Sequence, residues 1–296
     1  MTGGGTTPGF GGDWTRQKLD ILEKYLDAYT TALKNQTFRL VYIDAFAGAG
    51  RIYLESPNDE VLEADRRRFV AGSAKRALRV TDRPFDHLVF VEKNSERCAQ
   101  LRTLVNERPD RSIKIIEADA NDHLHTICQG EYGGSWRGVL FLDPFGTQLD
   151  WTTLQHVAQL ERMDTWLLFP ASAVARMLPE SRNPDEVSSA WADRLTRVYG
   201  DESWRRVYSI APQGDLFGSP GVEREKGVDD LLRLYKDRLR TVFGSRLLED
   251  SRTLTNSKNS PLFEFIFCAG HPAGTGPAKR IARHLVWSQD STPISG

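Results

Sequence analysis

Cysteine is scarce in this sequence. Cys98, Cys128 and Cys268 are its three cysteines among 296 residues, and no two of them form a CxxC spacing. This pattern excludes a disulfide scaffold and any cysteine-only zinc or iron–sulfur site that a sequence would reveal. The motifs His123-Leu-His125 and Cys268-Ala-Gly-His271 lack a second matched pair at zinc spacing, so we predict no metal site.

Long apolar segments are lacking as well. No run approaches the roughly 18–20 residues that cross a bilayer. The N-terminus has no basic region followed by an apolar one. We therefore expect a cytoplasmic protein that does not associate with a membrane.

Neither sign of charge dominates. Lys and Arg number 39, Asp and Glu number 40, and the formal net charge is -1. This balance excludes a polycationic coat for nucleic acid, although a local basic face remains compatible with it.

The sequence does contain a regular alternation of strands and helices. Residues 1–12 are rich in Gly and Thr and predict a disordered leader, after which apolar residues at helical spacing predict a first helix. Strands are predicted at 38–43, 87–91, 113–116, 138–142 and 165–169. Nearly continuous apolar strands separated by helices are typical of an α/β fold whose parallel sheet is covered on both faces.

The alternation stops after the fifth strand. Residues 176–245 predict a helical insertion that recognises a substrate or partner. Beyond it, 246–254 and 262–269 predict two strands, and the short link between them requires antiparallel pairing. We thus expect one α/β domain, 13–175 with 246–296, that carries the insertion.

Four consecutive strands end on distinctive residues. These residues are Asp44 with a glycine turn, Glu92, Asp119, and Asp143 followed by Pro144, Phe145 and Gly146. Ligands of open α/β sheets bind at the carboxyl ends of the strands. The sequence therefore predicts one binding site formed by these four strand ends.

The glycine turn, Asp44-Ala-Phe-Ala-Gly-Ala-Gly50, lets backbone approach a ligand closely because Gly48 and Gly50 have no Cβ. A dinucleotide site would need a third glycine and an acidic residue about 20 positions further on, and both are missing. A P-loop is excluded because Gly-Lys-Ser/Thr does not occur.

Taken in order, Asp-x-Phe-Ala-Gly-x-Gly, Phe-Val-Glu, Glu-Ala-Asp and Phe-Leu-Asp-Pro-Phe-Gly resemble class I S-adenosylmethionine-dependent methyltransferases. More closely, the chain resembles the bacterial three-Cys-motif partner family. This second likeness rests on Trp14-Thr15 with Lys18-Leu19, Tyr42 to Gly48, Gly72-Ser73, Phe141 to Gly146 with Trp151, and Phe265 to His271. A more distant likeness is to 23S rRNA adenine-N6 methyltransferases, through Asp44 to Arg51 and the following Gly-Ser.

These resemblances imply a Rossmann-like methyltransferase sheet, mostly parallel, with an antiparallel C-terminal hairpin. They also imply that S-adenosylmethionine is the cofactor. Asp44 would hold the turn and attract the cofactor's ammonium, Glu92 would accept the ribose hydroxyls, and Asp119 would accept the adenine amino group. Lys18 would reach the cofactor carboxylate. The full expected cofactor site is Lys18, Asp44, Phe46, Gly48, Gly50, Glu92, Asp119 and Ala120.

The resemblance makes Asp143, Pro144 and Phe145 the candidate catalytic residues. In amino-methyltransferases, an Asp and the carbonyl of the next proline orient an NH2 group, and an aromatic residue stacks on the base. This chain has no second proline, so its aromatic residue arrives one position early and Gly146 follows. A structural turn at the strand end remains an alternative.

The insertion combines arginines with aromatic residues. They are Arg176, Arg182, Arg194, Arg197, Arg205 and Arg206, with Trp191, Tyr199, Trp204 and Tyr208. Such residues suit a flipped or single-stranded base, although helically spaced aromatics also build cores.

Two functions stay open at the level of sequence. The first is methyl transfer to an amino nitrogen of a nucleobase in RNA or DNA. The second is a non-catalytic partner protein that binds S-adenosylmethionine or a related nucleoside and docks to a radical-type protein bearing three cysteines.

Overall fold

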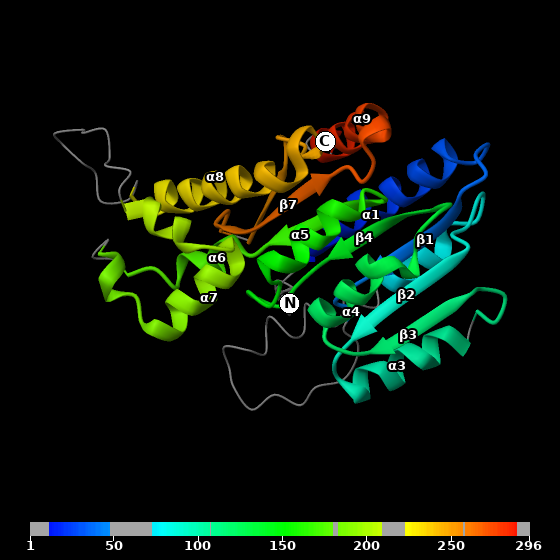
Figure 1. Ribbon diagram of the computed structural model, residues 1–296, viewed down its shortest axis with the longest axis horizontal. Helices are drawn as coiled ribbons and strands as arrows, with labels where there is room; N and C mark the ends of the chain where they lie inside the picture. The colour runs from blue at the N-terminus through cyan, green and yellow to red at the C-terminus, as the bar shows by residue number, and fades with distance from the viewer. Residues whose placement is uncertain are drawn as a thin grey trace, which may run out of the picture.

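The computed structural model describes residues 12–47, 73–106, 108–179, 183–208, 223–256 and 258–288. A seven-stranded sheet lies at its centre, in the order β3-β2-β1-β4-β5-β7-β6 (Figure 1). The strands are β1 (Arg39–Asp44), β2 (His87–Glu92), β3 (Ile113–Glu117), β4 (Trp136–Leu142), β5 (Met163–Phe169), β6 (Arg252–Thr255) and β7 (Pro261–Cys268).

The first five strands pair in parallel, and β7 pairs antiparallel with both β5 and β6. The order 3-2-1-4-5 reverses direction between β1 and β4, which is the switch point where open α/β sheets bind ligands. The α/β fold predicted from sequence, with a mostly parallel sheet and an antiparallel C-terminal hairpin, is confirmed.

Helices cover both faces of the sheet. They are α1 (Gly12–Ala32), α3 (Ser95–Asn106), α4 (Ala120–Thr126), α5 (Trp151–Leu160), α6 (Ala171–Ala175), α7 (Ser189–Tyr199), α8 (Glu223–Phe243) and α9 (Thr275–Trp287). Residues 73–79 are also helical. Short 3-10 turns occupy Pro184–Glu186, Glu202–Tyr208, Gly244–Arg246 and Pro272–Gly274, and a π turn occupies Ile127–Glu131.

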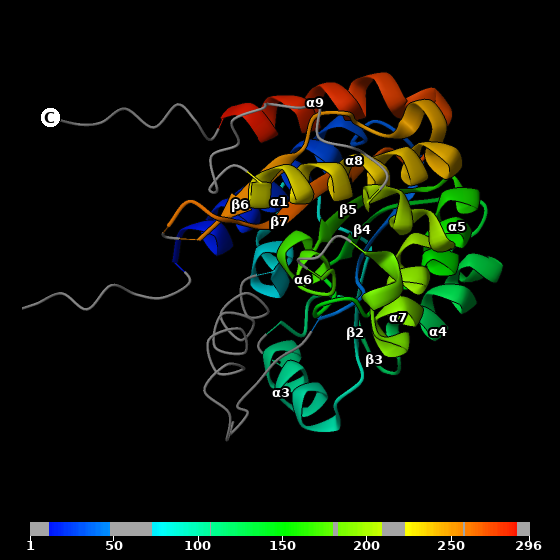
Figure 2. The ribbon, with the colours of Figure 1, turned by 90° about the vertical axis from the view of Figure 1, so that its left-hand side faces the viewer.

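Two hydrophobic cores follow from the alternation of side chains along the strands. On β1, Val41 and Ile43 face the core that α4, α5, α7 and α8 cover. Leu40 and Tyr42 face the other core, under α1, α3, α9 and 73–79. Figure 2 shows the α4, α5 and α7 layer on one side of the sheet and α1 on the other.

The strand predicted over 246–254 is interrupted in its first half, where Leu247 forms an isolated antiparallel bridge with Cys268 and no regular strand follows until β6. Residues Gly244–Arg246 form a 3-10 turn, and β6 begins only at Arg252. The buried guanidinium of Arg246 donates instead to the carbonyls of Gly270 and Ala158, at 2.9 and 2.7 Å. The backbone beside it still pairs with β7, because the amide of Leu248 donates to Phe267 O at 2.9 Å.

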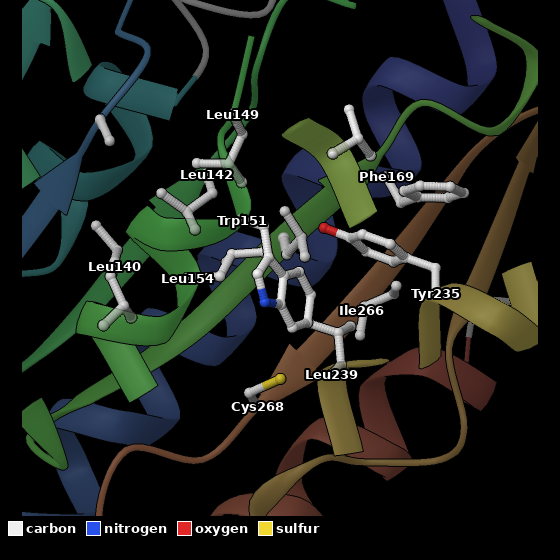
Figure 3. Packing of buried hydrophobic residues seen from close by; sticks show 14 of the residues in the cluster. Leu140, Leu142, Leu149, Trp151, Leu154, Phe169, Tyr235, Leu239, Ile266 and Cys268 are labelled. Carbon is white, nitrogen blue, oxygen red and sulfur yellow. The ribbon is translucent and has the colours of Figure 1, made fainter. Parts of the chain in front are cut away.

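The helical residues after β5 share the first core with the sheet. On α8, Tyr235 stacks on Phe169 of β5 with ring centroids 4.2 Å apart. Leu239 also points into this core, towards Trp151 of α5 (Figure 3). From α7, Leu195 is buried in the same cluster. Helix α8 therefore packs on the sheet as the layers around it do.

Candidate functional site

The ends of β1, β2 and β4 lie side by side. Asp44 is in register with Phe90 of β2 and Phe141 of β4, so Glu92 and Asp143 follow just beyond these partners. The turn after β1 is fixed between its neighbours, because the amide of Ala45 donates to Phe141 O at 3.0 Å and that of Ala47 to Val91 O at 2.8 Å. This edge of the sheet brings together side chains from three strands.

Asp44 is almost fully buried, on the same face of β1 as Tyr42. Its Oδ2 accepts a hydrogen bond from Ser73 at 2.8 Å. Its Oδ1 has no hydrogen-bond partner among the described residues, and neither does the Tyr42 hydroxyl. Two buried polar atoms without partners mark a place where a polar ligand group or a water fits.

Burial raises the pKa of Asp44 to about 7. The Ser73 hydroxyl opposes this shift, the neighbouring charge of Asp143 adds to it, and the amide of Phe46 and the ammonium of Lys18 lower the pKa again. A cationic ligand beside this carboxyl group would favour its charged form and so lower its pKa.

Lys18 reaches this edge from α1. Its Nζ lies 3.2 Å from Oδ1 of Asp143, and the lysine side chain is 2% exposed against 11% for the aspartate. The rings of Trp14 and Phe263 lie on one side of the ammonium, with centroids 4.9 and 5.8 Å away from it and 4.9 Å from each other. The sequence predicts Lys18 as a cofactor ligand, and the structure places it against the candidate catalytic aspartate.

Glu92 is buried at the end of β2. Its Oε1 accepts from the amide of Asn94 at 2.8 Å and lies 3.8 Å from Nη1 of Arg97. The carbonyl of Glu92 accepts from the amide of Ala118 at 3.1 Å, which joins the end of β2 to the segment that leads into α4. Glu92 is thus a fixed carboxylate one strand away from Asp44.

Asp119 caps the N-terminus of α4. Its Oδ1 accepts from the amide of Asn121 at 3.0 Å, and its Oδ2 lies 3.2 Å from Lys93 Nζ. Burial by itself would raise the pKa of Asp119, but the Asn121 amide and Lys93 outweigh it and the pKa is lowered. Ala120, the first residue of α4, is buried beside it. Among the described residues, Glu92 and Asp119 make their hydrogen bonds and ion pairs near the carboxyl ends of β2 and β3. These contacts do not involve Lys18 or Asp143.

The loop after β4 turns sharply. Pro144 is buried and Phe145 is half-buried, while Gly146 has a left-handed φ of 58°. Beneath the loop, Pro144, Gly146 and Tyr235 line a cavity of about 10 Å³, room for no more than one water. This cavity is too small to hold a nucleobase.

Sequence reasoning missed two positioning residues. Ser73 holds Asp44, and the Gly72-Ser73 pair of the resemblance was the signal that pointed to it. Asn121 donates to the carbonyl of Gln148 at 2.9 Å and accepts from the amide of Asp150 at 3.0 Å. It thereby ties the start of α4 to the loop after β4, and an Asn within the first turn of a short helix carries no such signal in sequence.

Several predicted features lie outside the described residues or inside the core. Gly48 and Gly50 fall outside the described ranges, as do residues 1–11 and Arg182, whereas Gly12 opens α1. Trp204 is fully buried, and Trp191 is 45% exposed on α7.

The part of the chain that the structure describes holds no group of three or more His, Cys, Asp or Glu residues suited to a metal ion. In the same residues, no helix is long and apolar enough to span a membrane.

No protein-family model matches the sequence, and no curated protein matches it either. Among solved structures, the chain is similar to a Legionella pneumophila protein of the DUF519 family, with 12% identity and a TM-score of 0.48 over 95% of this chain and 92% of that one. It is also similar to YhhF, a candidate methyltransferase of Escherichia coli, with 12% identity and a TM-score of 0.30 over 50% of this chain and 69% of that one. At these scores the function of neither protein transfers to this chain.

The class of fold follows from the sheet. Five parallel strands in the order 3-2-1-4-5, continued by β7 in the reverse direction and by β6, form the Rossmann-like sheet of class I methyltransferases. The buried carboxylates lie at the carboxyl ends of its central strands, where the fold binds its ligands.

Proposed function

We propose that this chain is an S-adenosylmethionine-dependent methyltransferase that acts on an amino nitrogen of a nucleobase in RNA or DNA. The observation that carries the proposal is the grouping of buried Asp44 at the end of β1, buried Lys18 from α1, and Asp143 just after β4, whose side chain is 11% exposed. The resemblance to rRNA adenine-N6 methyltransferases from Asp44 to Arg51 supports it, as do the acidic residues at the four strand ends, whereas the resemblance to the three-Cys-motif partner family favours the alternative given below.

The residues at the edge of the sheet fit the cofactor. Oδ1 of Asp44 is a buried acceptor without a partner among the described residues, which suits the ammonium of an amino acid moiety. Glu92 offers a fixed, buried carboxylate to the ribose hydroxyls. Asp119 follows on the next strand, where it would accept from the adenine amino group. When bound, the cofactor supplies an activated methyl group on a sulfonium.

Asp143 would orient the acceptor. Its Oδ1 contacts Lys18, and its Oδ2 has no hydrogen-bond partner among the described residues. Oδ2 can therefore accept a hydrogen from an amino group, together with the carbonyl of Pro144. Both contacts direct the nitrogen lone pair away from the protein acceptors and towards the methyl donor. Phe145, half-buried on the same loop, supplies an aromatic face for the base.

Calorimetry with S-adenosylmethionine tests the cofactor half of the proposal. We expect binding by the wild type, and weakening of roughly 10–100-fold in Glu92→Gln, because a hydrogen bond to a charged group is lost. Glu131→Gln is the matched control, since Glu131 pairs with Lys114 at 2.8 Å beside the start of β3, at the opposite end of the strands. No binding by the wild type at millimolar cofactor would contradict the proposal.

Transfer of a tritiated methyl group to total RNA and DNA tests the catalytic half. We expect Asp143→Ala to lower the rate by roughly 10²-fold, because the acceptor loses its orientation. Asp82→Ala is the control, an exposed aspartate in the loop before β2. Label uptake that survives Asp143→Ala would exclude Asp143 as the orienting group.

The alternative is a non-catalytic partner protein that binds S-adenosylmethionine or a related nucleoside and docks to a radical-type protein bearing three cysteines. One observation favours it: the loop after β4 lacks the second proline of amino-methyltransferases, so its aromatic residue arrives one position early. Cofactor binding by the wild type without label uptake in RNA, DNA or protein would favour this alternative over methyl transfer.

A further inference from the structure

We propose that Lys18 is the positioning residue for Asp143 and not a ligand of the cofactor carboxylate, so that α1 builds the acceptor half of the site. This inference rests on the proposed function. Its starting point is one contact between distant parts of the chain, the 3.2 Å ion pair between Lys18 Nζ and Asp143 Oδ1.

The burial of Lys18 makes this contact specific. A lysine is almost never fully buried unless it is paired, because its ammonium loses the solvation of water. Lys18 is 1% exposed, and the aromatic rings of Trp14 and Phe263 lie beside its ammonium. An ammonium so enclosed stays with the carboxylate it contacts.

Lys18 also influences a second carboxylate. It lowers the pKa of Asp44, whereas the charge of Asp143 raises it. The ammonium of Lys18 thus acts on Asp44 through its charge and on Asp143 by direct contact.

An amino acceptor needs hydrogen-bond acceptors for its N–H groups. A carboxylate oxygen accepts from N–H and leaves the nitrogen lone pair unengaged. Because Lys18 occupies Oδ1, the carboxylate plane is fixed and Oδ2 is left for the substrate.

The C-terminal hairpin fixes the position of Lys18 in turn. Trp14, one helical turn before Lys18, packs on Phe263 of β7 with ring centroids 4.9 Å apart at 31°. Trp14 of α1 and Phe263 of β7 thus pack together beside the lysine, and the acceptor half of the site depends on elements outside the five parallel strands.

The experiment compares Lys18→Met, Lys18→Arg, Asp143→Asn and the double variant Lys18→Met/Asp143→Asn. Lys24→Met is the matched control, an exposed lysine on the same helix. For each protein we would measure the Kd for S-adenosylmethionine by calorimetry, kcat and KM in the tritiated-methyl assay, and the midpoint of urea unfolding.

We expect Lys18→Met to lower kcat by roughly 10²-fold through misplacement of Asp143, while the cofactor Kd stays close to that of the wild type. Lys18→Arg should recover part of kcat, because a cation again faces the carboxylate. The double variant should lose no more kcat than Asp143→Asn alone. Its urea midpoint should lie above that of Lys18→Met, because the single variant leaves a buried charge without its partner.

Two results would overturn the proposal. One is a cofactor Kd at least tenfold weaker in Lys18→Met with kcat preserved, which would make Lys18 a cofactor ligand. The other is strictly additive effects of Lys18→Met and Asp143→Asn on both kcat and the urea midpoint. If the wild type transfers no methyl group, both the proposed function and this catalytic role of Lys18 are wrong. If the effects of Lys18→Met and Asp143→Asn on the urea midpoint are then still non-additive, the two residues form a purely structural pair.

Discussion

The hydroxyl of Tyr25 on α1 donates a hydrogen bond of 2.6 Å to Oδ2 of Asp164, near the start of β5 and deep in the core. The amide of Gly270 donates to Oδ1 of the same carboxylate, also at 2.6 Å. This contact joins α1, β5 and the segment after β7. The contact lies at the opposite end of β5 from the candidate site. Substitutions there should therefore change the stability of the fold without changing the site.

The first prediction concerns this contact. Burial raises the pKa of Asp164 to about 6, against the opposing hydrogen bonds from Tyr25 and Gly270. The folded chain therefore holds this proton more tightly than the unfolded chain, whose Asp titrates near 3.9. The stability that Asp164 contributes is present below about pH 4 and is lost as the pH rises to about 6.

Tyr25→Phe should lower the free energy of unfolding by about 1–3 kcal/mol. It should also extend the loss of stability to higher pH, since the donor that favours the ionised carboxylate is gone. Tyr29→Phe is the control, one turn further along α1, where the ring stacks on Phe85. Urea unfolding between pH 4 and 8 measures both variants, and equal losses in both would contradict the assignment.

The second prediction separates stability from cofactor binding at Asp44. Its pKa of about 7 lies above the usual value, so the carboxylate destabilises the folded state progressively as the pH rises through 7, by up to about 4 kcal/mol. Asp44→Asn should therefore unfold at higher urea than the wild type at pH 8, and at similar urea at pH 4. It should also bind S-adenosylmethionine more weakly.

The matched control for Asp44→Asn is Asp110→Asn. The hydrogen bond from Arg108 lowers the pKa of Asp110 to about 2, so this carboxylate favours the folded state at neutral pH. Asp110→Asn should therefore lower the urea midpoint at pH 8, whereas Asp44→Asn should raise it. If Asp44→Asn also lowered stability at pH 8, the buried carboxylate would already have a compensating partner.

The third prediction concerns the end of α7. Gly200 has a φ of 82°, and a Cβ there would overlap the indole of Trp151. Gly200→Ala should therefore cost about 1–3 kcal/mol through strain and overpacking. Gly227→Ala, inside α8 with open space around it, should instead stabilise by about 0.5–1 kcal/mol. Thermal unfolding measures both variants. An equal change in the unfolding temperature of the two would contradict the prediction.

The fourth prediction tests whether the helical residues after β5 fold with the sheet. Leu239 of α8 is fully buried in the core that also holds Trp151 and Ile266 (Figure 3). Leu239→Ala should lower the free energy of unfolding by about 2–5 kcal/mol, in one cooperative transition. Leu232→Ala, at a half-buried position of the same helix, should cost less. A separate early transition in Leu239→Ala would mean that 176–245 folds as its own unit.

Local pattern was enough to predict most of the fold. The apolar runs that end at Asp44, Glu92 and Leu142 are β1, β2 and β4, because a strand buried on both faces needs continuous apolar residues. The segment predicted as one strand over 246–254 instead forms the end of a 3-10 turn, an isolated bridge at Leu247 and then β6, an interruption that no local pattern predicts. Arg246 donates to carbonyls of other segments, and these contacts arise only once the layers have packed.

The candidate site, like the fold, could be predicted only in part from the sequence. From sequence alone, the acidic strand ends Asp44, Glu92 and Asp143 could be assigned to one edge, because parallel strands joined by helices all end on the same side. Which side chains pair at that edge was decided by the tertiary structure. Lys18 meets Asp143, 125 residues away in sequence, because α1 packs on the C-terminal hairpin, where Trp14 contacts Phe263. Burial then leaves the carboxylate as the partner of its ammonium in place of water.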